Sequence, residues 1–173
     1  MTRPTLRADA RGFTLAEVIV ASMVLLIALL VIATMFPMGH QQVADAGRMT
    51  LAVTAARQVL EDLGALPFDS VANLNGYTTA NAATLPGANP ELAAARRWRY
   101  MIGGSGGGFS FTTAELGQYG TITPIGGAAT IQITNAPGGT CTAAGSRCQA
   151  TVTVTVPGLT SSVQLSTIFT RLF

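Results

Sequence analysis

The sequence predicts an α+β protein in which one long amino-terminal helix packs on a carboxyl-terminal antiparallel sheet. Three observations support this fold class. An apolar run long enough to span a membrane opens the chain, a stripe of apolar residues at helical spacing follows it, and the last third alternates apolar residues with threonine. The 173 residues amount to one ordinary domain with a short addition, and a charged content of only 10% excludes a disordered chain.

The apolar run forms the membrane half of the predicted helix. From Val18 to Phe36 no residue is charged, and Glu17 is the only charged residue between Phe13 and Phe36. As a helix, the stretch from Phe13 is about 36 Å long, which is enough to cross a hydrocarbon layer of about 30 Å. Arginines ahead of the span predict a cytoplasmic amino terminus and an extracytoplasmic remainder. Pro37 is expected either to kink the helix or to mark its exit from the bilayer.

The second half of the predicted helix is amphipathic and packs on the soluble domain. Gly64 and Pro67 indicate that it ends there. Its apolar face follows steps of three and four residues: Met49, Ala52, Val53, Ala56, Val59, Leu60 and Leu63.

The remaining residues predict a surface loop followed by a sheet. Residues 65–95 show little periodicity and are interpreted as a loop, which admits a short helix at 90–96. Alternation then predicts strands at 97–102, 129–134, 150–156 and 162–170, with a further short strand at Phe109 and Phe111. The residues expected to point inward are Trp98, Tyr100 and Ile102 in the first of these ranges and Val163, Leu165 and Phe169 in the last. Short turns favour antiparallel pairing, and the Val/Ile face is expected to receive the helix stripe.

Two common kinds of amino-terminal segment explain only part of this pattern. A secretory signal peptide needs an apolar stretch of about 7–15 residues and a small-residue cleavage site. Ala44-Asp45-Ala46 fits such a site, but the uncharged stretch is longer and ends well before it. An uncut membrane anchor leaves Glu17 unexplained, because a carboxylate one turn inside an apolar span is costly.

The heptapeptide Arg11-Gly12-Phe13-Thr14-Leu15-Ala16-Glu17 resembles the signal of type IV prepilins and of type II secretion pseudopilins. In those families a basic leader ends in glycine and precedes Phe-Thr-Leu-x-Glu and an apolar helix. The resemblance implies that a prepilin peptidase cleaves between Gly12 and Phe13 and N-methylates Phe13. It also implies that Glu17 pairs with the Phe13 amine of an offset neighbour and so sets the register between subunits. Cleavage removes three arginines and one aspartate, which lowers the formal charge from +2 to zero.

The same resemblance implies a pilin-like division of the chain. We expect a leader at 1–12, a transmembrane and filament-core helix at 13–37, the amphipathic half of that helix at 38–66 and a globular domain at 67–173. The implied function is that of a minor pilin-like subunit in motility, adhesion or DNA uptake. The implied partners are the peptidase, other pilin subunits, an assembly platform protein and its ATPase. A secretion pseudopilin and a membrane-anchored extracytoplasmic binding module are the alternatives.

The two cysteines and three clustered arginines are the other candidate sites. Cys141 and Cys148 lie close together, so outside the cytoplasm they are expected to form a disulfide that closes a short loop. Arg96, Arg97 and Arg99 alternate with aromatic residues, a composition that also occurs in single-strand DNA contacts. The small net charge argues against DNA as a partner, and we favour arginines that are solvated or pair with neighbouring subunits.

The sequence indicates neither an enzyme nor a cofactor or metal site. His40 is the single histidine and has no evident nucleophile or carboxylate partner. The glycine-rich segment 103–108 lacks the Lys-Ser/Thr ending of a phosphate loop. Asp and Glu are too sparse near the predicted strands for a calcium site.

Overall fold

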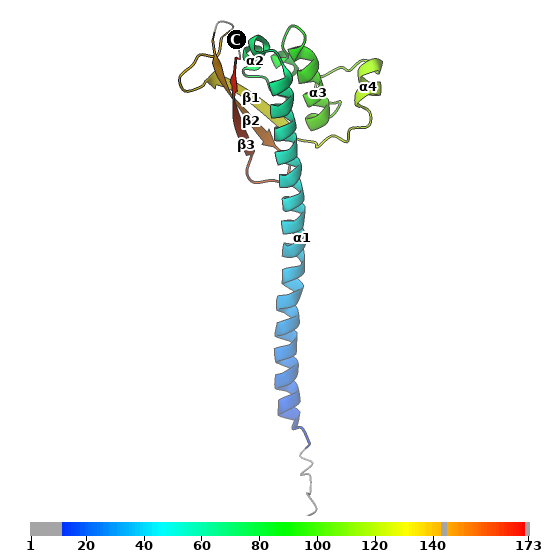
Figure 1. The fold of residues 1–173 in the computed structure, drawn as a ribbon. Coiled ribbons are helices and arrows are strands. Elements are labelled where there is room, and N and C mark those ends of the chain that lie inside the picture. The colour runs from blue at the N-terminus through cyan, green and yellow to red at the C-terminus, as the bar shows by residue number, and fades with distance from the viewer. Residues whose placement is uncertain (1–11, 143–144, 172–173) are drawn as a thin grey trace, which may run out of the picture. The chain divides into compact units, whose positions relative to one another are not determined.

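The computed structural model describes residues 12–142 and 145–171 and has an α+β architecture. The chain begins with helix α1 (Leu15–Ala65), passes through several short helices and ends in a three-stranded antiparallel sheet (Figure 1). The leader predicted at 1–12 lies outside the described residues apart from Gly12. The chain divides into two compact units at Val43 and Ala44, inside α1.

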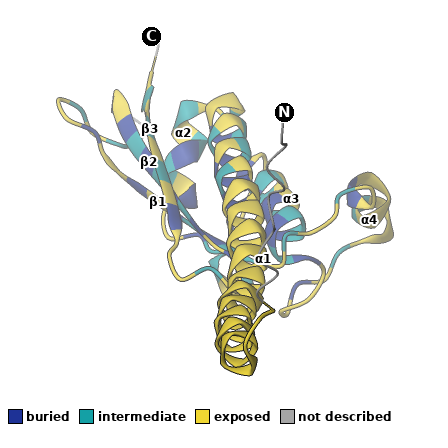
Figure 2. Ribbon diagram, turned by 90° about the horizontal axis from the view of Figure 1, so that it is seen from below, coloured by how far each residue is buried: buried dark blue, intermediate teal, exposed yellow. Residues whose placement is uncertain are grey.

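The first unit is the amino-terminal part of α1. This helix is 51 residues long and contains Pro37 in its interior, so the helix does not end there. Every described residue up to Leu51 is exposed (Figure 2). Leu and Ala of this run are good helix formers. In apolar surroundings a helix is also favoured because it satisfies the backbone hydrogen-bonding groups within one segment. The segment is long and apolar enough to cross a membrane.

The second unit holds a core between the carboxyl-terminal part of α1 and the sheet. The buried α1 residues fall on one face, as predicted, although Met49 is 42% exposed and does not belong to it. Val53 and Leu60 lie at the margin and pack against the core. The buried set also includes Ala55, which the sequence stripe omitted: Ala52, Ala55, Ala56, Val59 and Leu63.

The sheet has the order β1-β2-β3, with β1 at Ala128–Asn135, β2 at Arg147–Thr155 and β3 at Val163–Thr170. Both pairs are antiparallel, as predicted. Alternation places Val152 and Val154 of β2 in the core at 0% exposure, while the intervening threonines face outward. Strand β2 is central and is therefore more buried than β3, whose pattern is mostly half-buried and exposed.

The strand predicted at 97–102 is wrong, because these residues belong to helix α3 (Glu91–Gly103). The alternation of residues 97–102 resembled that of a strand, but the buried residues of the longer segment 95–102 are spaced as on one face of a helix. Ala95, Trp98 and Ile102 stand three and four residues apart and are all fully buried. The helix expected at 90–96 is present and continues for two further turns.

The short strand predicted at Phe109 and Phe111 is also wrong. Neither residue lies in a strand, and the chain next forms helix α4 (Thr113–Tyr119). Thr112 and Glu115 make a complete capping box at its start. Phe111 meets Tyr100 edge to face at a centroid distance of 5.5 Å, which holds this region against α3.

The segment interpreted as a plain loop contains helix α2 (Phe68–Val71) and two short 3-10 helices, η1 (Ala72–Leu74) and η2 (Ala82–Thr84). The residues between the two 3-10 helices cover the outer edge of β1. Gly76 and Thr79 donate backbone hydrogen bonds to Ile131 and Ala129, and Tyr77 accepts one from Ile131. One edge of the sheet is therefore already paired.

Candidate assembly site at the amino terminus

The predicted scissile bond lies ahead of the first helical residue. Gly12, Phe13 and Thr14 are non-helical and exposed, and helix α1 begins at Leu15. Apart from its chain neighbours, no described residue has an atom within 4 Å of the position where a Cβ of Gly12 would be, and Phe13 is 87% exposed. These three residues lie outside the helix and are exposed, as the approach of a peptidase to the backbone requires.

Thr14 and Glu17 form a reciprocal capping box at the start of α1. The Thr14 backbone N–H donates to Oε2 of Glu17 at 3.0 Å, and the Glu17 N–H donates to the Thr14 hydroxyl oxygen at 3.3 Å. The Thr14 hydroxyl also donates to Oε2 of Glu17 at 3.0 Å. The pattern Thr-x-x-Glu before an apolar run predicts such a box, and it is the signal in the sequence that was overlooked.

This geometry gives the Glu17 carboxylate two distinguishable oxygens. Oε2 accepts both hydrogen bonds from Thr14, whereas Oε1 has no hydrogen-bond partner among the described residues. The Phe13 nitrogen would become an amine on cleavage, and it lies next to Thr14 in the chain. The carboxylate is thus held at the helix start with one oxygen available for a further donor.

The three clustered arginines lie on α3 and are all engaged within the chain. Arg96 forms a bidentate ion pair with Glu115, and one of its hydrogen bonds measures 2.8 Å. Arg97 pairs with Asp62 at 3.6 Å. The hydrogen bond from Arg96 is the main reason that the pKa of Glu115 falls to about 2. A phosphate contact at Arg96 or Arg97 would have to replace these partners within the chain. DNA contact by this cluster, which the small net charge already argued against, is not tested by the structure.

Arg99 is buried, with 6% of its surface exposed, which the predicted strand did not suggest. Its guanidinium donates to the backbone oxygens of Thr79, at 2.8 Å, and Gly106. It also lies over the Phe109 ring at 4.6 Å from the centroid. Arg99 therefore ties the glycine-rich segment and the 75–79 region to α3, and it faces the interior rather than a ligand.

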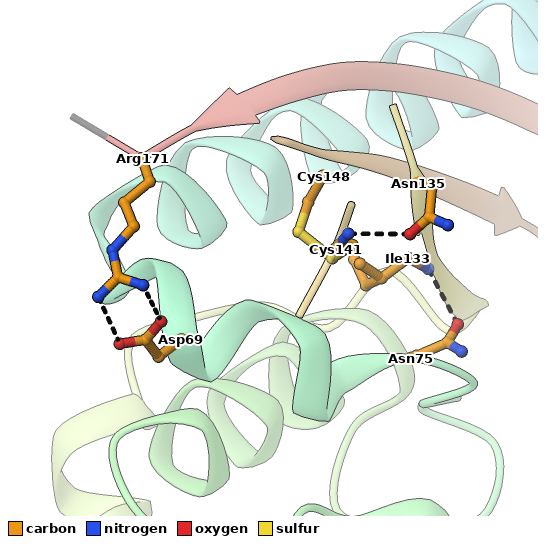
Figure 3. The surroundings of a disulfide bond; sticks show 7 residues. All are labelled: Asp69, Asn75, Ile133, Asn135, Cys141, Cys148 and Arg171. Carbon is orange, nitrogen blue, oxygen red and sulfur yellow. Dashed lines mark hydrogen bonds and ion pairs between the residues drawn. A yellow bond between two sulfur atoms is a disulfide. The ribbon is translucent and has the colours of Figure 1, made fainter. Parts of the chain in front are cut away.

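Cys141 and Cys148 form a disulfide at the start of β2 (Figure 3). Asn135 of β1 accepts a hydrogen bond from the Cys141 N–H at 2.8 Å. Cys148 is fully buried in the core, so the bridge attaches the β1–β2 connection to the sheet. A loop of this length gives an entropic stabilisation of about 2–3 kcal/mol.

The other sequence candidates do not assemble into a site. His40 is exposed on α1. Among residues 12–142 and 145–171, no three His, Cys, Asp or Glu side chains are close enough together to hold a metal ion.

Comparison with known proteins identifies the amino-terminal segment. Residues 7–33 match the sequence model of the family described as the prokaryotic N-terminal methylation motif. The comparisons with curated proteins and with solved structures gave no match. The matched residues include Gly12, Phe13, Glu17 and most of the apolar span. The chain therefore carries a type IV prepilin-like signal ahead of an α+β pilin-like fold.

Proposed function

We propose that this protein is a minor pilin-like subunit of a type IV pilus or a related filament. In this proposal a prepilin peptidase removes residues 1–12 and methylates the Phe13 amine. Residues 13–37 then hold the subunit in the cytoplasmic membrane, with residues 38–66 and the globular domain 67–173 outside the cytoplasm. Assembly by a platform protein and its ATPase moves the helix from lipid into a bundle with the helices of other pilin subunits.

The observation that carries the proposal is the combination of a processing signal with an apolar amino-terminal part of α1 whose described residues are all exposed. All described residues from Gly12 to Leu51 are exposed, although most of them are apolar. Lipid and a bundle of similar helices are both apolar surroundings, so exchanging one for the other costs little free energy. A helix that keeps its apolar span after processing and can leave the lipid suits a filament subunit better than a permanent membrane anchor. This structural role requires no enzymatic activity of the subunit itself.

The carboxylate of Glu17 supplies the register in this proposal. An unpaired charge in an apolar bundle is costly, whereas a charge that meets an amine is compensated. The free Oε1 of Glu17 is available to the Phe13 amine of a neighbouring subunit. Only one axial offset between neighbouring helices brings these two groups together, so the pair favours that offset.

Filament incorporation of Glu17→Leu tests the proposal. We expect normal removal of residues 1–12 but a strong loss of the subunit from sheared filaments, measured by quantitative immunoblotting. Gln42→Leu is the matched control, because it also replaces an exposed polar side chain by leucine on the same helix, outside residues 13–37, and it is expected to assemble normally. Normal incorporation of Glu17→Leu would contradict the register role.

A pseudopilin of a type II secretion system is the alternative within the same class. The disulfide near the carboxyl terminus favours the pilin, since such a bridge is more typical of pilins. Deletion of the gene distinguishes the two: loss of surface filaments or of motility, adhesion or DNA uptake indicates a pilin, and retention of exported enzymes in the periplasm indicates a pseudopilin. A membrane-anchored binding module would leave both phenotypes unchanged.

A further inference from the structure

The two edges of the sheet differ in a way that points to a docking site. The segment before η2 pairs with the outer edge of β1 through three backbone hydrogen bonds. Among the described residues, no backbone hydrogen bond joins the outer edge of β3 to any other segment. Figure 1 shows β3 as the last strand of the sheet, beside β2. An open strand edge can accept another extended chain.

The pairing register identifies the backbone groups that this edge leaves open. Ala129 and Ile131 of β1 direct their N–H and C=O groups toward the 75–79 segment, so Thr130 must direct its own toward β2. Thr130 pairs with Thr153 of β2, so Thr153 directs its backbone groups toward β1. The preceding residue, Val152, therefore directs its own toward its partner Leu165 of β3. Because hydrogen-bonding direction alternates along a strand, the even-numbered residues of β3 point theirs away from the sheet: Gln164, Ser166, Ile168 and Thr170.

Strand β3 also lacks the features that commonly protect an edge. Between Val163 and Thr170 there is no charged residue and no proline. The register with β2 is continuous over eight pairs, so the strand contains no bulge. Ile168 is 52% exposed on the outer face. No described segment therefore pairs with this edge anywhere along the strand.

Two adjoining hollows lie along the inner side of this edge, and we call them the edge groove. The first, of about 370 Å³, is bounded by Arg57, Leu60 and Glu61 of α1 and by residues 165–167 and 169 of β3. The second, of about 320 Å³, lies between the end of α1, helix α2 and residues 169–171. Phe169 borders both hollows. Side chains on one face of a strand recur every 6–7 Å or so, so an added strand would place alternate side chains in this groove.

The charges around the edge groove cancel in pairs. Arg57 and Glu61 lie on one wall, one helical turn apart. At the other end Arg171 and Asp69 form an ion pair at 3.2 Å, visible in Figure 3. The strand itself is uncharged. This balance fits an uncharged occupant, since a charged segment would lose solvation there without gaining a compensating partner.

We propose that β3 and the edge groove bind an uncharged, extended segment of another protein chain by strand addition. Apolar side chains at alternate positions of that segment occupy the groove, and its backbone pairs with Gln164, Ser166, Ile168 and Thr170. Main-chain hydrogen bonds supply affinity and the hollows supply selectivity for alternating apolar residues. This inference concerns the globular part of the chain and does not depend on the amino-terminal processing or on filament assembly.

Amide hydrogen exchange of the full chain in detergent micelles, followed by NMR, tests the inference. In the free chain we expect the amides of Ser166 and Ile168 to exchange at least about tenfold faster than those of Leu165 and Thr167. The probe is a capped peptide with the sequence of residues 149–156, which β3 already pairs with in the fold. Adding the peptide should slow amide exchange at Ser166 and Ile168 by about tenfold. A peptide of the same composition in which apolar and polar residues do not alternate should leave these exchange rates unchanged.

Two variants make the outcome specific to the edge. Ser166→Pro removes an outward N–H while leaving the pairing with β2 intact, and it should abolish protection by the peptide. Ile168→Lys should do the same by charging the edge, whereas Gln132→Lys, on the exposed face of β1, should leave protection unchanged. If Ser166→Pro does not fold, the comparison of Ile168→Lys with Gln132→Lys still tests the inference.

Three results would overturn the inference. The first is a free chain in which Ser166 is as protected as Leu165 at every protein concentration. The second is protection that rises with concentration in the absence of peptide, which would mean that copies of this chain pair with each other at β3. The third is a peptide that leaves the exchange rates unchanged.

Discussion

Trp98 donates its indole N–H to the Asp62 carboxylate at 2.8 Å, which joins α3 to α1. Trp98 is fully buried, so the hydrogen bond satisfies a donor that no water reaches. The same carboxylate accepts a hydrogen bond from Gln58 at 3.1 Å and pairs with Arg97 at 3.6 Å. A single acidic residue on α1 thus positions the helix that carries the clustered arginines.

Replacing Asp62 by alanine is expected to lower the free energy of unfolding by about 2–3 kcal/mol, because it leaves the buried indole donor of Trp98 without an acceptor. Denaturant unfolding followed by tryptophan fluorescence measures this, as Trp98 is the single tryptophan. Glu61→Ala is the control: Glu61 is exposed and should change stability by about 0.5 kcal/mol or less. Equal effects at the two positions would show that the indole contact does not stabilise the packing of α3.

The ion pair between Glu115 and Arg96 predicts a loss of stability at low pH. The pKa of Glu115 is lowered to about 2 in the folded chain, chiefly by the hydrogen bond from Arg96. Because this pKa is lower in the folded than in the unfolded chain, the ionised carboxylate stabilises the fold at pH values above about 4.5. This stabilisation is lost as the pH falls toward about 2. We expect α4 to loosen in this window, with a contribution of about 1–2 kcal/mol from this pair.

Near-UV circular dichroism of the tyrosines measures this transition, since Tyr119 lies in α4 and contacts Tyr100 at a centroid distance of 5.6 Å. Glu115→Gln should be less stable at neutral pH and should lack the Glu115 part of the pH dependence. A variant that loosens over the same pH range and to the same extent as the parent would assign the transition to another carboxylate.

Two glycines of the 103–108 segment are expected to respond differently to alanine. A Cβ at Gly103 would overlap the guanidinium of Arg99. A Cβ at Gly106 would have no atom of another described residue within 4 Å, apart from its chain neighbours. Gly103→Ala should therefore destabilise the fold by about 1–3 kcal/mol. Gly106→Ala should be neutral within about 0.5 kcal/mol, as expected for a surface position. Thermal unfolding of both variants checks the difference, and equal midpoints would mean that Arg99 does not fix this segment.

The capping box predicts that Thr14 stabilises the first turn of α1. Thr14→Ala should weaken that turn by about 0.5–2 kcal/mol and so speed amide exchange at Glu17 by about 2- to 30-fold in micelles. Thr14→Ser keeps the hydroxyl and should exchange at close to the parent rate. If alanine and serine behave alike, the hydroxyl does not cap the helix in a membrane-like environment.

The long helix and the sheet could be predicted because their patterns extend over many residues. The apolar span and the stripe from Ala52 to Leu63 repeat over several turns, and β2 alternates valine and threonine without interruption. The stripe and the alternation both depend on burial of one face, which is the same physical cause that forms the core. The span is recognised instead by its length and its uncharged composition. The close spacing of Cys141 and Cys148 likewise left little choice of partner.

The middle of the chain could not be predicted in the same way. Between residues 97 and 102 a helix and a strand both place Trp98 and Ile102 inward, and only the preceding alanines favour the helix. Arg99 is buried through contacts with Thr79 and Gly106, which no local pattern reveals. The pairing of the 75–79 segment with β1 connects residues 50 to 55 positions apart, and so it too depends on tertiary structure.

Mass spectrometry of the amino terminus of the mature protein, isolated from the cells that produce it, tests the central claim most directly. The account predicts a chain that begins with N-methylated Phe13 and lacks residues 1–12. A chain that retains Met1, or one that begins at Gly47 after the Ala44-Asp45-Ala46 site, would contradict it.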